Sequence, residues 1–154
     1  MENRNLGKKA AYGILGGIVG GLVFGALMAA AGALPLVAGL VGSQDPIVGF
    51  LVHMGISAFI GATFVGFFQS LVTGPQRAMV LGTAYGFVWW ILGGLILMPV
   101  FLGMPIQVAN ALTADNLGGL VGHLLYGFAL GATYVLLAAR TGLVAKALAK
   151  APAP

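Results

Sequence analysis

The sequence predicts an all-α membrane protein with four transmembrane helices, built from a tandem repeat of a two-helix unit. An apolar composition, four long apolar segments and a segment that occurs twice lead to this prediction. Of the 154 residues, 60% are hydrophobic and 6% are charged, whereas soluble domains carry about 25% charged residues. A soluble domain of this composition could not cover its surface with polar groups, so a lipid bilayer is the expected surrounding.

The apolar segments cover about residues 11–33, 46–70, 78–102 and 117–139. Each reaches the roughly 20 residues that a helix needs to cross the hydrocarbon core of a bilayer. They lack the two-residue alternation of membrane β-strands. We therefore expect a single membrane domain over residues 1–154, in which residues 141–154 form a cytoplasmic tail.

Residues 12–70 and 82–140 match without a gap when the chain is shifted by 70 positions. The matches include Met28/Met98, Pro35/Pro105, Asp45/Asp115, Gly49/Gly119 and His53/His123. Each repeat unit contains two membrane crossings, so both units enter the membrane from the same side. We expect a pseudo-twofold axis along the membrane normal rather than inverted repeats.

The distribution of charge predicts the topology. All seven basic residues precede the first span, lie between the second and third, or follow the fourth: Arg4, Lys8, Lys9, Arg77, Arg140, Lys146 and Lys150. The loops 34–45 and 104–116 contain Asp45 and Asp115 and no basic residue. We expect the protein in the inner (plasma) membrane of the cell. The positive-inside rule then predicts that both termini lie in the cytoplasm. The basic excess fits contact with anionic lipid and not with nucleic acid.

The two outer loops are expected to resemble each other. The segments 35–43 and 105–113 both begin with proline and are apolar but too short to span, so short interfacial or re-entrant helices are predicted. Asp45 is expected to cap the second transmembrane helix, and Asp115 to cap the fourth.

Glycines recur every four residues in the first span, at Gly13, Gly17, Gly21 and Gly25. This spacing places them on one helix face, where a neighbouring backbone can approach closely. The neighbour is either another helix of the chain or a second copy, and the sequence leaves both open. A homo-oligomer or a larger membrane complex is therefore an expected partner, besides the bilayer.

Each histidine stands in a stripe of small residues. The stripes contain Gly49, Ser57 and Gly61 around His53, and Gly119, Gly127 and Gly131 around His123. Both histidines lie about two helical turns, roughly 10 Å, from the outer ends of their spans, and Met28 and Met98 should reach a similar depth. We expect these four residues, Met28, His53, Met98 and His123, to form one site.

Three interpretations of this site are open. In the first, each imidazole donates a hydrogen bond to a backbone carbonyl and only locks the packing. In the second, His53 and His123 ligate a metal centre, either a b-type haem with bis-His or His/Met axial ligands or copper, where thioethers favour Cu(I). In the third, the histidines line a path for protons, ions or a small solute. The lack of outer Lys or Arg to pair with propionates speaks against haem.

The expected function is that of a non-enzymatic membrane subunit. It would be an accessory component of a larger membrane complex and bind a haem or other metal centre through the paired His site. The alternative is a small oligomeric channel or transporter for a proton, ion or small solute. No enzyme is expected, because no cysteine, no carboxylate within a span and no hydrolase or nucleotide-binding motif accompanies the histidines.

Two short patterns carry a resemblance, GFVWW at Gly86–Trp90 and LGMP at Leu102–Pro105. With them, the chain resembles the small four-span prokaryotic integral membrane proteins of unknown function. The resemblance extends over most of the chain and implies no activity, so no residue takes a role from it.

Overall fold

The computed structural model describes residues 2–140, with side chains from Leu6 onward. In chain order the elements are α1 (Glu2–Ala30), α2 (Leu34–Ala38), η1 (Gly39–Val41), α3 (Pro46–Phe68), α4 (Pro75–Trp89), η2 (Trp90–Leu97), α5 (Met98–Phe101), η3 (Val108–Asn110) and α6 (Ala114–Arg140). The part of the chain that the structure describes is thus all-helical. The predicted tail at 141–154 lies outside the described residues.

Four helical segments are long and apolar enough to cross a membrane. They are Leu6–Ala30, Pro46–Phe68, Pro75–Phe101 and Ala114–Arg140, which confirms the four predicted spans. The third segment joins α4, η2 and α5 into one continuous helix. These segments support a membrane location, whereas the side on which the ends lie stays a prediction.

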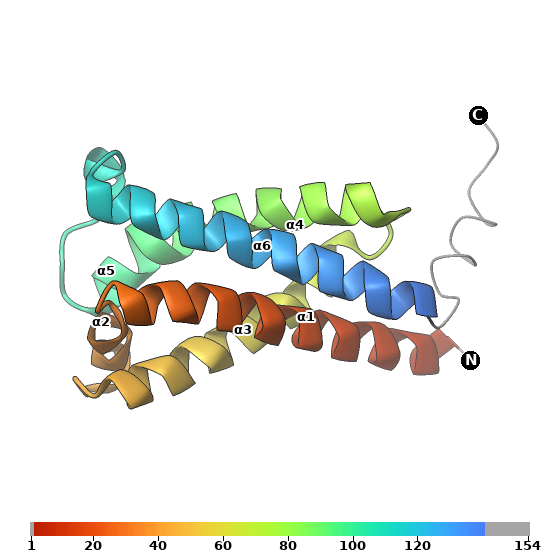
Figure 1. The fold of residues 1–154 in the computed structure, drawn as a ribbon, viewed down its shortest axis with the longest axis horizontal. Coiled ribbons are helices and arrows are strands. Elements are labelled where there is room, and N and C mark those ends of the chain that lie inside the picture. Colours follow the sequence, from red (N-terminus) through yellow and green to blue (C-terminus); the bar gives the residue numbers. More distant parts are fainter. Residues whose placement is uncertain (1, 141–154) are drawn as a thin grey trace.

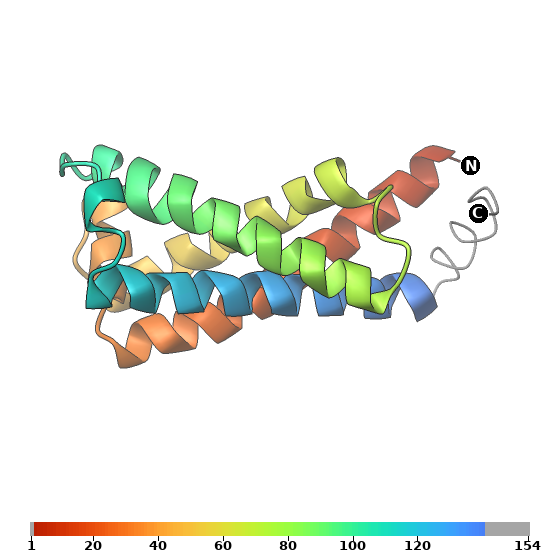
Figure 2. The same ribbon diagram turned by 90° about the horizontal axis from the view of Figure 1, so that it is seen from above.

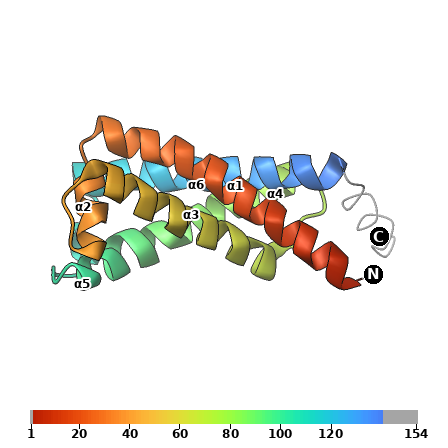
Figure 3. The same cartoon turned by 90° about the horizontal axis from the view of Figure 1, so that it is seen from below.

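The long helices form an antiparallel bundle in which α1 packs against both α3 and α6, and α4 packs against α6. Contacts between α3 and α4 are few. The short segments α2 and α5 gather at one end, called here the α2 end, and α1 begins and α6 ends at the opposite, terminal end (Figures 1 and 2). Figure 3 shows α1 crossing α3 along most of its length. The backbones of α3 and α4 thus lie farther apart than those of the other packed pairs, and the two helices meet through side chains such as Phe64 and Tyr85.

The glycine row of α1 packs against α3 of the same chain. A side chain at Gly13 would collide with the carbonyl of Gly61, and one at Gly17 with the carbonyl of Ser57. At Gly21 it would meet the side chain of Ser57. The close packing predicted from the spacing is confirmed, and the partner is a helix of the chain itself.

The pairs α1/α6 and α4/α6 also pack closely at glycines. Gly16 and Gly20 on the neighbouring face of α1 leave room only for the backbone of α6. Between α4 and α6, Gly82 and Gly127 each lie against the other's carbonyl. Because lipid supplies no hydrophobic drive between helices, these close backbone contacts are a main source of attraction.

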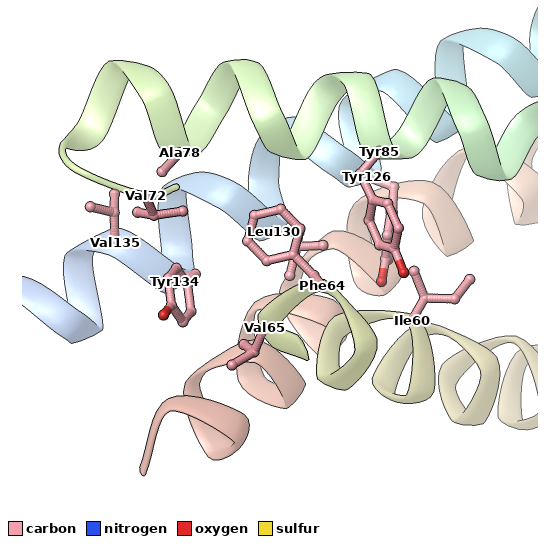
Figure 4. Packing of buried hydrophobic residues seen from close by; sticks show 10 residues of the cluster. All are labelled: Ile60, Phe64, Val65, Val72, Ala78, Tyr85, Tyr126, Leu130, Tyr134 and Val135. Atoms are coloured by element: carbon pink, nitrogen blue, oxygen red, sulfur yellow. The ribbon is translucent and has the colours of Figure 1, made fainter. Parts of the chain in front are cut away.

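A buried apolar core fills the bundle from its middle towards the terminal end (Figure 4). Its members are Ile60, Phe64, Val65, Val72, Ala78, Tyr85, Tyr126, Leu130, Tyr134 and Val135. Phe64 and Leu130 have no accessible surface at all. Within this region the Tyr126 hydroxyl donates a 2.8 Å hydrogen bond to the carbonyl of Ser57, which ties α6 to α3.

The first outer loop folds as predicted. Asp45 caps α3, because its Oδ1 accepts a 2.7 Å hydrogen bond from the backbone N–H of Ile47. The segment 35–43 lies largely in α2 and η1, and Leu34 and Val37 are buried there. The burial of this apolar side against the start of α3 explains why so short a segment is helical.

The second outer loop does not, and two predictions for it are wrong. The segment 105–113 contains only the single 3-10 turn η3, because Ile106, Val108 and Leu112 are at least half exposed and pack on nothing that would hold a helix. Asp115 is not the cap, because α6 begins at Ala114 and Asp115 lies in its first turn. An acidic side chain there still interacts favourably with the helix dipole.

Candidate functional site

A cavity of about 330 Å³ lies in the α2 half of the bundle. Its walls come from α1, α3, α6 and the third span, and Val37 of α2 and Leu40 of η1 also line it. All four residues that the sequence pointed to line this cavity: Met28, His53, Met98 and His123. The structure thus brings the four candidate residues around one space.

The third span changes from α- to π-helix where it borders the cavity. The N–H of Met98 bonds to the carbonyl of Gly93, five residues earlier. The wider π turns place Gly93, Gly94 and Met98 on the cavity wall, and such turns occur often at functional sites.

The sequence analysis missed the π segment, although Pro99 was a signal for it. Proline has no N–H, so it cannot bond to the carbonyl of Leu95 as the next α-helical turn would require. That carbonyl accepts a 2.8 Å hydrogen bond from the N–H of Gln107 instead. The outer loop is thereby fastened to the helix just beside the cavity.

His53 is fixed by a neighbouring helix. Its Nε2 lies 3.0 Å from the carbonyl of Gly21, and since a carbonyl only accepts, Nε2 carries the proton. The ring edge with Cδ2 faces α1, where a methyl group on Gly25 would lie 3.3 Å away. Nδ1 is on the opposite edge and keeps its lone pair, with no hydrogen bond from any residue in 2–140.

His123 is fixed by its own helix. Its Nδ1 donates a 2.8 Å hydrogen bond to the carbonyl of Gly119, so Nε2 bears the lone pair. The adjacent Cε1 faces Gly94 of the cavity wall, where a methyl group would lie 3.6 Å away. Among the described residues, Trp89 Nε1 is the buried side-chain nitrogen or oxygen left without a partner. His123 Nε2 makes no hydrogen bond to a described residue, and His123 lines the cavity.

Phe24 lies against both histidines. Its ring centroid is 5.3 Å from that of His53 and 4.7 Å from that of His123. The two imidazole centroids are therefore no more than about 10 Å apart. The ring of Phe24 rests on Gly122, where a side chain would collide with it. Nothing in the sequence singled out Phe24, because it is an ordinary apolar residue in an apolar span.

The tryptophans of the third span have separate roles. Trp90 donates a 2.9 Å hydrogen bond from Nε1 to the carbonyl of Asn116 and so holds η2 to the start of α6. Trp89 lines the cavity with its ring and stands nearly perpendicular to Tyr85, at 6.1 Å between centroids. These contacts fix the wall of the cavity opposite α3.

The cavity opens sideways between α3 and the third span. Phe59 and Phe101 line it and are 62% and 73% exposed on the outer surface of the bundle. No Asp, Glu, Lys or Arg lines it, and residues 2–140 contain no cluster of three or more His, Cys, Asp or Glu. The cavity is thus lined by two imidazoles and two methionines in an otherwise apolar wall, and each imidazole has one ring nitrogen without a hydrogen bond to the described residues.

Compared with protein-family models, curated proteins and solved structures, the chain matches none.

Proposed function

We propose that this chain is a non-enzymatic integral membrane subunit that binds a metal centre through His53 and His123, as an accessory component of a larger membrane complex. One observation carries the proposal. Met28, His53, Met98 and His123 come from α1, α3, α5 and α6 and converge on a single cavity.

The hydrogen bonds of the histidines support this proposal. Histidines that ligate metals almost always donate their other ring N–H to a carbonyl or carboxylate, which fixes the tautomer and the ring orientation. His53 and His123 each do so and each keep one unbonded nitrogen. Histidines that only lock the packing would make the same bonds, but protein interiors are close-packed, and such residues need no cavity beside them.

The size of the cavity favours a small metal centre over haem. Pockets for organic ligands measure about 300–1,000 Å³, so 330 Å³ is near the lower limit. A tetrapyrrole held between the two imidazoles would also have to displace Phe24, which touches both. A single metal ion is much smaller than the cavity.

The alternative function, a channel or transporter, has less support from the packing. The terminal half of the bundle is filled by the apolar core, with Phe64 and Leu130 fully buried. The cavity opens sideways and not along the bundle axis. These features favour a binding site over a path through one copy of the chain.

We also propose that the two halves of the chain arose by duplication of a helix pair. Gly61 and Gly131, which correspond in the 70-residue alignment, both contact the first helix of their own half. Gly61 contacts Gly13 of α1. In the 70-residue alignment Gly13 corresponds to Thr83 of α4, but Gly131 contacts Ala78 of α4 instead. The second helices keep the aligned register and the first helices do not, which breaks the symmetry of the two units.

The predicted orientation has one supporting feature. Lys8, Lys9, Arg77 and Arg140 all belong to the terminal end, at the start of α1, the start of α4 and the end of α6. The positive-inside rule applied to this arrangement puts the terminal end in the cytoplasm and the α2 end outside.

The absorption spectrum and the metal content of the full chain, purified in mild detergent, test the function. We expect a bound metal in the unaltered protein and its loss in His53→Asn and His123→Asn, with helix content unchanged. Asn116→Ala, outside the cavity, serves as a control that keeps the metal. A colourless, metal-free protein that conducts protons or ions in liposomes would replace this function with the alternative.

A further inference from the structure

The geometry points to Cu(I), a soft monovalent ion, as the metal bound in the cavity by His53, His123, Met28 and Met98. This inference rests on the proposed metal-binding function and names the ion. It follows from the charge of the surroundings, the softness of the ligands and the position of the methionines.

The charge of the surroundings favours a monovalent ion. All four ligands are neutral, and no acidic side chain lines the cavity to compensate an ion. Among the described residues Asp45 is occupied in capping α3 and Asp115 lies in the first turn of α6. A divalent or trivalent ion would bring more uncompensated charge into an apolar wall, and such charge is very costly. A single positive charge costs least.

The softness of the ligands favours copper over the hard monovalent ions. Thioether sulfur is a soft ligand that selects Cu(I), whereas Na⁺ and K⁺ bind oxygen ligands. The π turn of η2 brings Met98 onto the cavity wall opposite α3, and Met28 lies on the wall that α1 provides. Like Zn²⁺, Cu(I) has a filled d shell, so it imposes no d-electron geometry on these four ligands.

The methionines lie nearer to the end of the bundle than the histidines. Met28 is two residues from the end of α1, and Met98 begins the short helix α5. Both are partly exposed, as is His123, while His53 is only 7% exposed. The thioethers would therefore bind the ion from the side nearer to the α2 end, and the imidazoles from the side nearer to the middle of the bundle.

A competition titration with Cu(I) tests the inference. The full chain in detergent, kept free of oxygen, is titrated against a chromogenic Cu(I) chelator of known affinity. We expect one Cu(I) per chain, with Ag(I) competing as a redox-inert substitute and Zn²⁺ not binding tightly. Met28→Leu and Met98→Leu should each weaken Cu(I) at least tenfold, and X-ray absorption should show both nitrogen and sulfur around copper.

Two variants control for folding and for non-specific binding. Met79→Leu removes a thioether outside the cavity and should leave the affinity for Cu(I) unchanged. His123→Asn keeps an amide that can hydrogen-bond, so a loss of Cu(I) with unchanged helix content reports a lost ligand.

The outcomes separate this inference from the proposed function. Tight Zn²⁺ or haem bound through His53 and His123, with no effect of Met28→Leu and Met98→Leu, would overturn Cu(I) and keep the metal-binding subunit. An affinity for Cu(I) that stays at the value of the unaltered protein in all four ligand variants would also overturn it. A chain that binds neither Cu(I) nor any other metal would overturn both.

Discussion

The hydroxyl oxygens of Thr63 and Tyr85 lie 2.7 Å apart and join α3 to α4. Thr63 donates its proton to the carbonyl of Ile60 at 2.9 Å, so Tyr85 is the donor in the contact between the two hydroxyls. The backbones of α3 and α4 approach each other at few places. This hydrogen bond, with the ring contacts of Tyr85 to Phe64 and Phe68, therefore holds the two helices together at the edge of the cavity.

Removing this link should destabilise the bundle modestly. Tyr85→Phe and Thr63→Val each lose the hydrogen bond, and about 1 kcal/mol of stability is expected from each. The double variant should cost little more than either single one, because both remove the same interaction. Unfolding in a detergent series measures these values. Thr83→Val, which loses only a bond within its own helix, is the control, and fully additive effects would mean that the two hydroxyls do not interact.

The glycine contacts predict a sharp contrast between two identical substitutions. Gly17→Leu pushes a side chain into the carbonyl of Ser57 and should cost about 1–3 kcal/mol or more, as overpacking does. Gly55→Leu, on the outer side of α3, meets nothing within 4 Å and should be neutral or slightly stabilising. Thermal unfolding of both variants compares them. Equal losses at the two positions would contradict the packing of α1 on α3.

His53 should tolerate an amide but not a hydrocarbon. Gln carries its amide nitrogen close to the place of Nε2 and can still donate a hydrogen bond to the carbonyl of Gly21, so His53→Gln should keep nearly full stability. His53→Leu removes the donor inside the bundle and should cost about 1–3 kcal/mol, the penalty of a buried group left unsatisfied. The difference between the two unfolding midpoints measures the hydrogen bond. A stable Leu variant would show that the bond contributes nothing to the fold.

The topology can be mapped with single cysteines, since the chain has none of its own. Cysteines at Gln44 and Leu112, both exposed at the α2 end, should react with an impermeant thiol reagent in intact cells. A cysteine at Gln76, exposed at the terminal end, should react only after the cells are opened. The reverse pattern would mean that the α2 end is cytoplasmic.

The spans and the close helix contacts could be predicted because they depend on local signals. Twenty apolar residues suffice for a transmembrane helix, and glycines at four-residue steps suffice for a close contact. The side chain of Asp45 before Pro46 likewise marks a helix start by its own chemistry. In each of these cases the residues that were recognised in the sequence are the same residues that form the helix, the close contact or the cap.

The cavity could be predicted only in part. The shared repeat positions pointed to Met28, His53, Met98 and His123, but not to Phe24, whose contact with both histidines depends on how α1 crosses α6. The π turns of η2 also escaped prediction. They depend on a bond between Leu95 and Gln107 that joins two separate segments.

The second outer loop shows why similar segments can fold differently. Residues 35–43 and 105–113 have comparable composition, but only the first buries large apolar side chains against another helix. A short helix is marginal without such packing. Sequence similarity between two loops therefore does not carry secondary structure from one to the other unless their surroundings match.

The contact lines between neighbouring helices, called seams here, differ in how closely they are packed. This difference bears on how many metal ions the proposed site would hold per chain. Gly16 and Gly20 close the seam between α1 and α6, while the seam between α3 and the third span stays open and holds the cavity. Two equally closed seams would leave no room for an occupant, and two equally open ones would divide the ligands between two half-sites. With one seam of each kind, Met28, His53, Met98 and His123 line a single cavity, and the proposed site would hold one metal ion per chain.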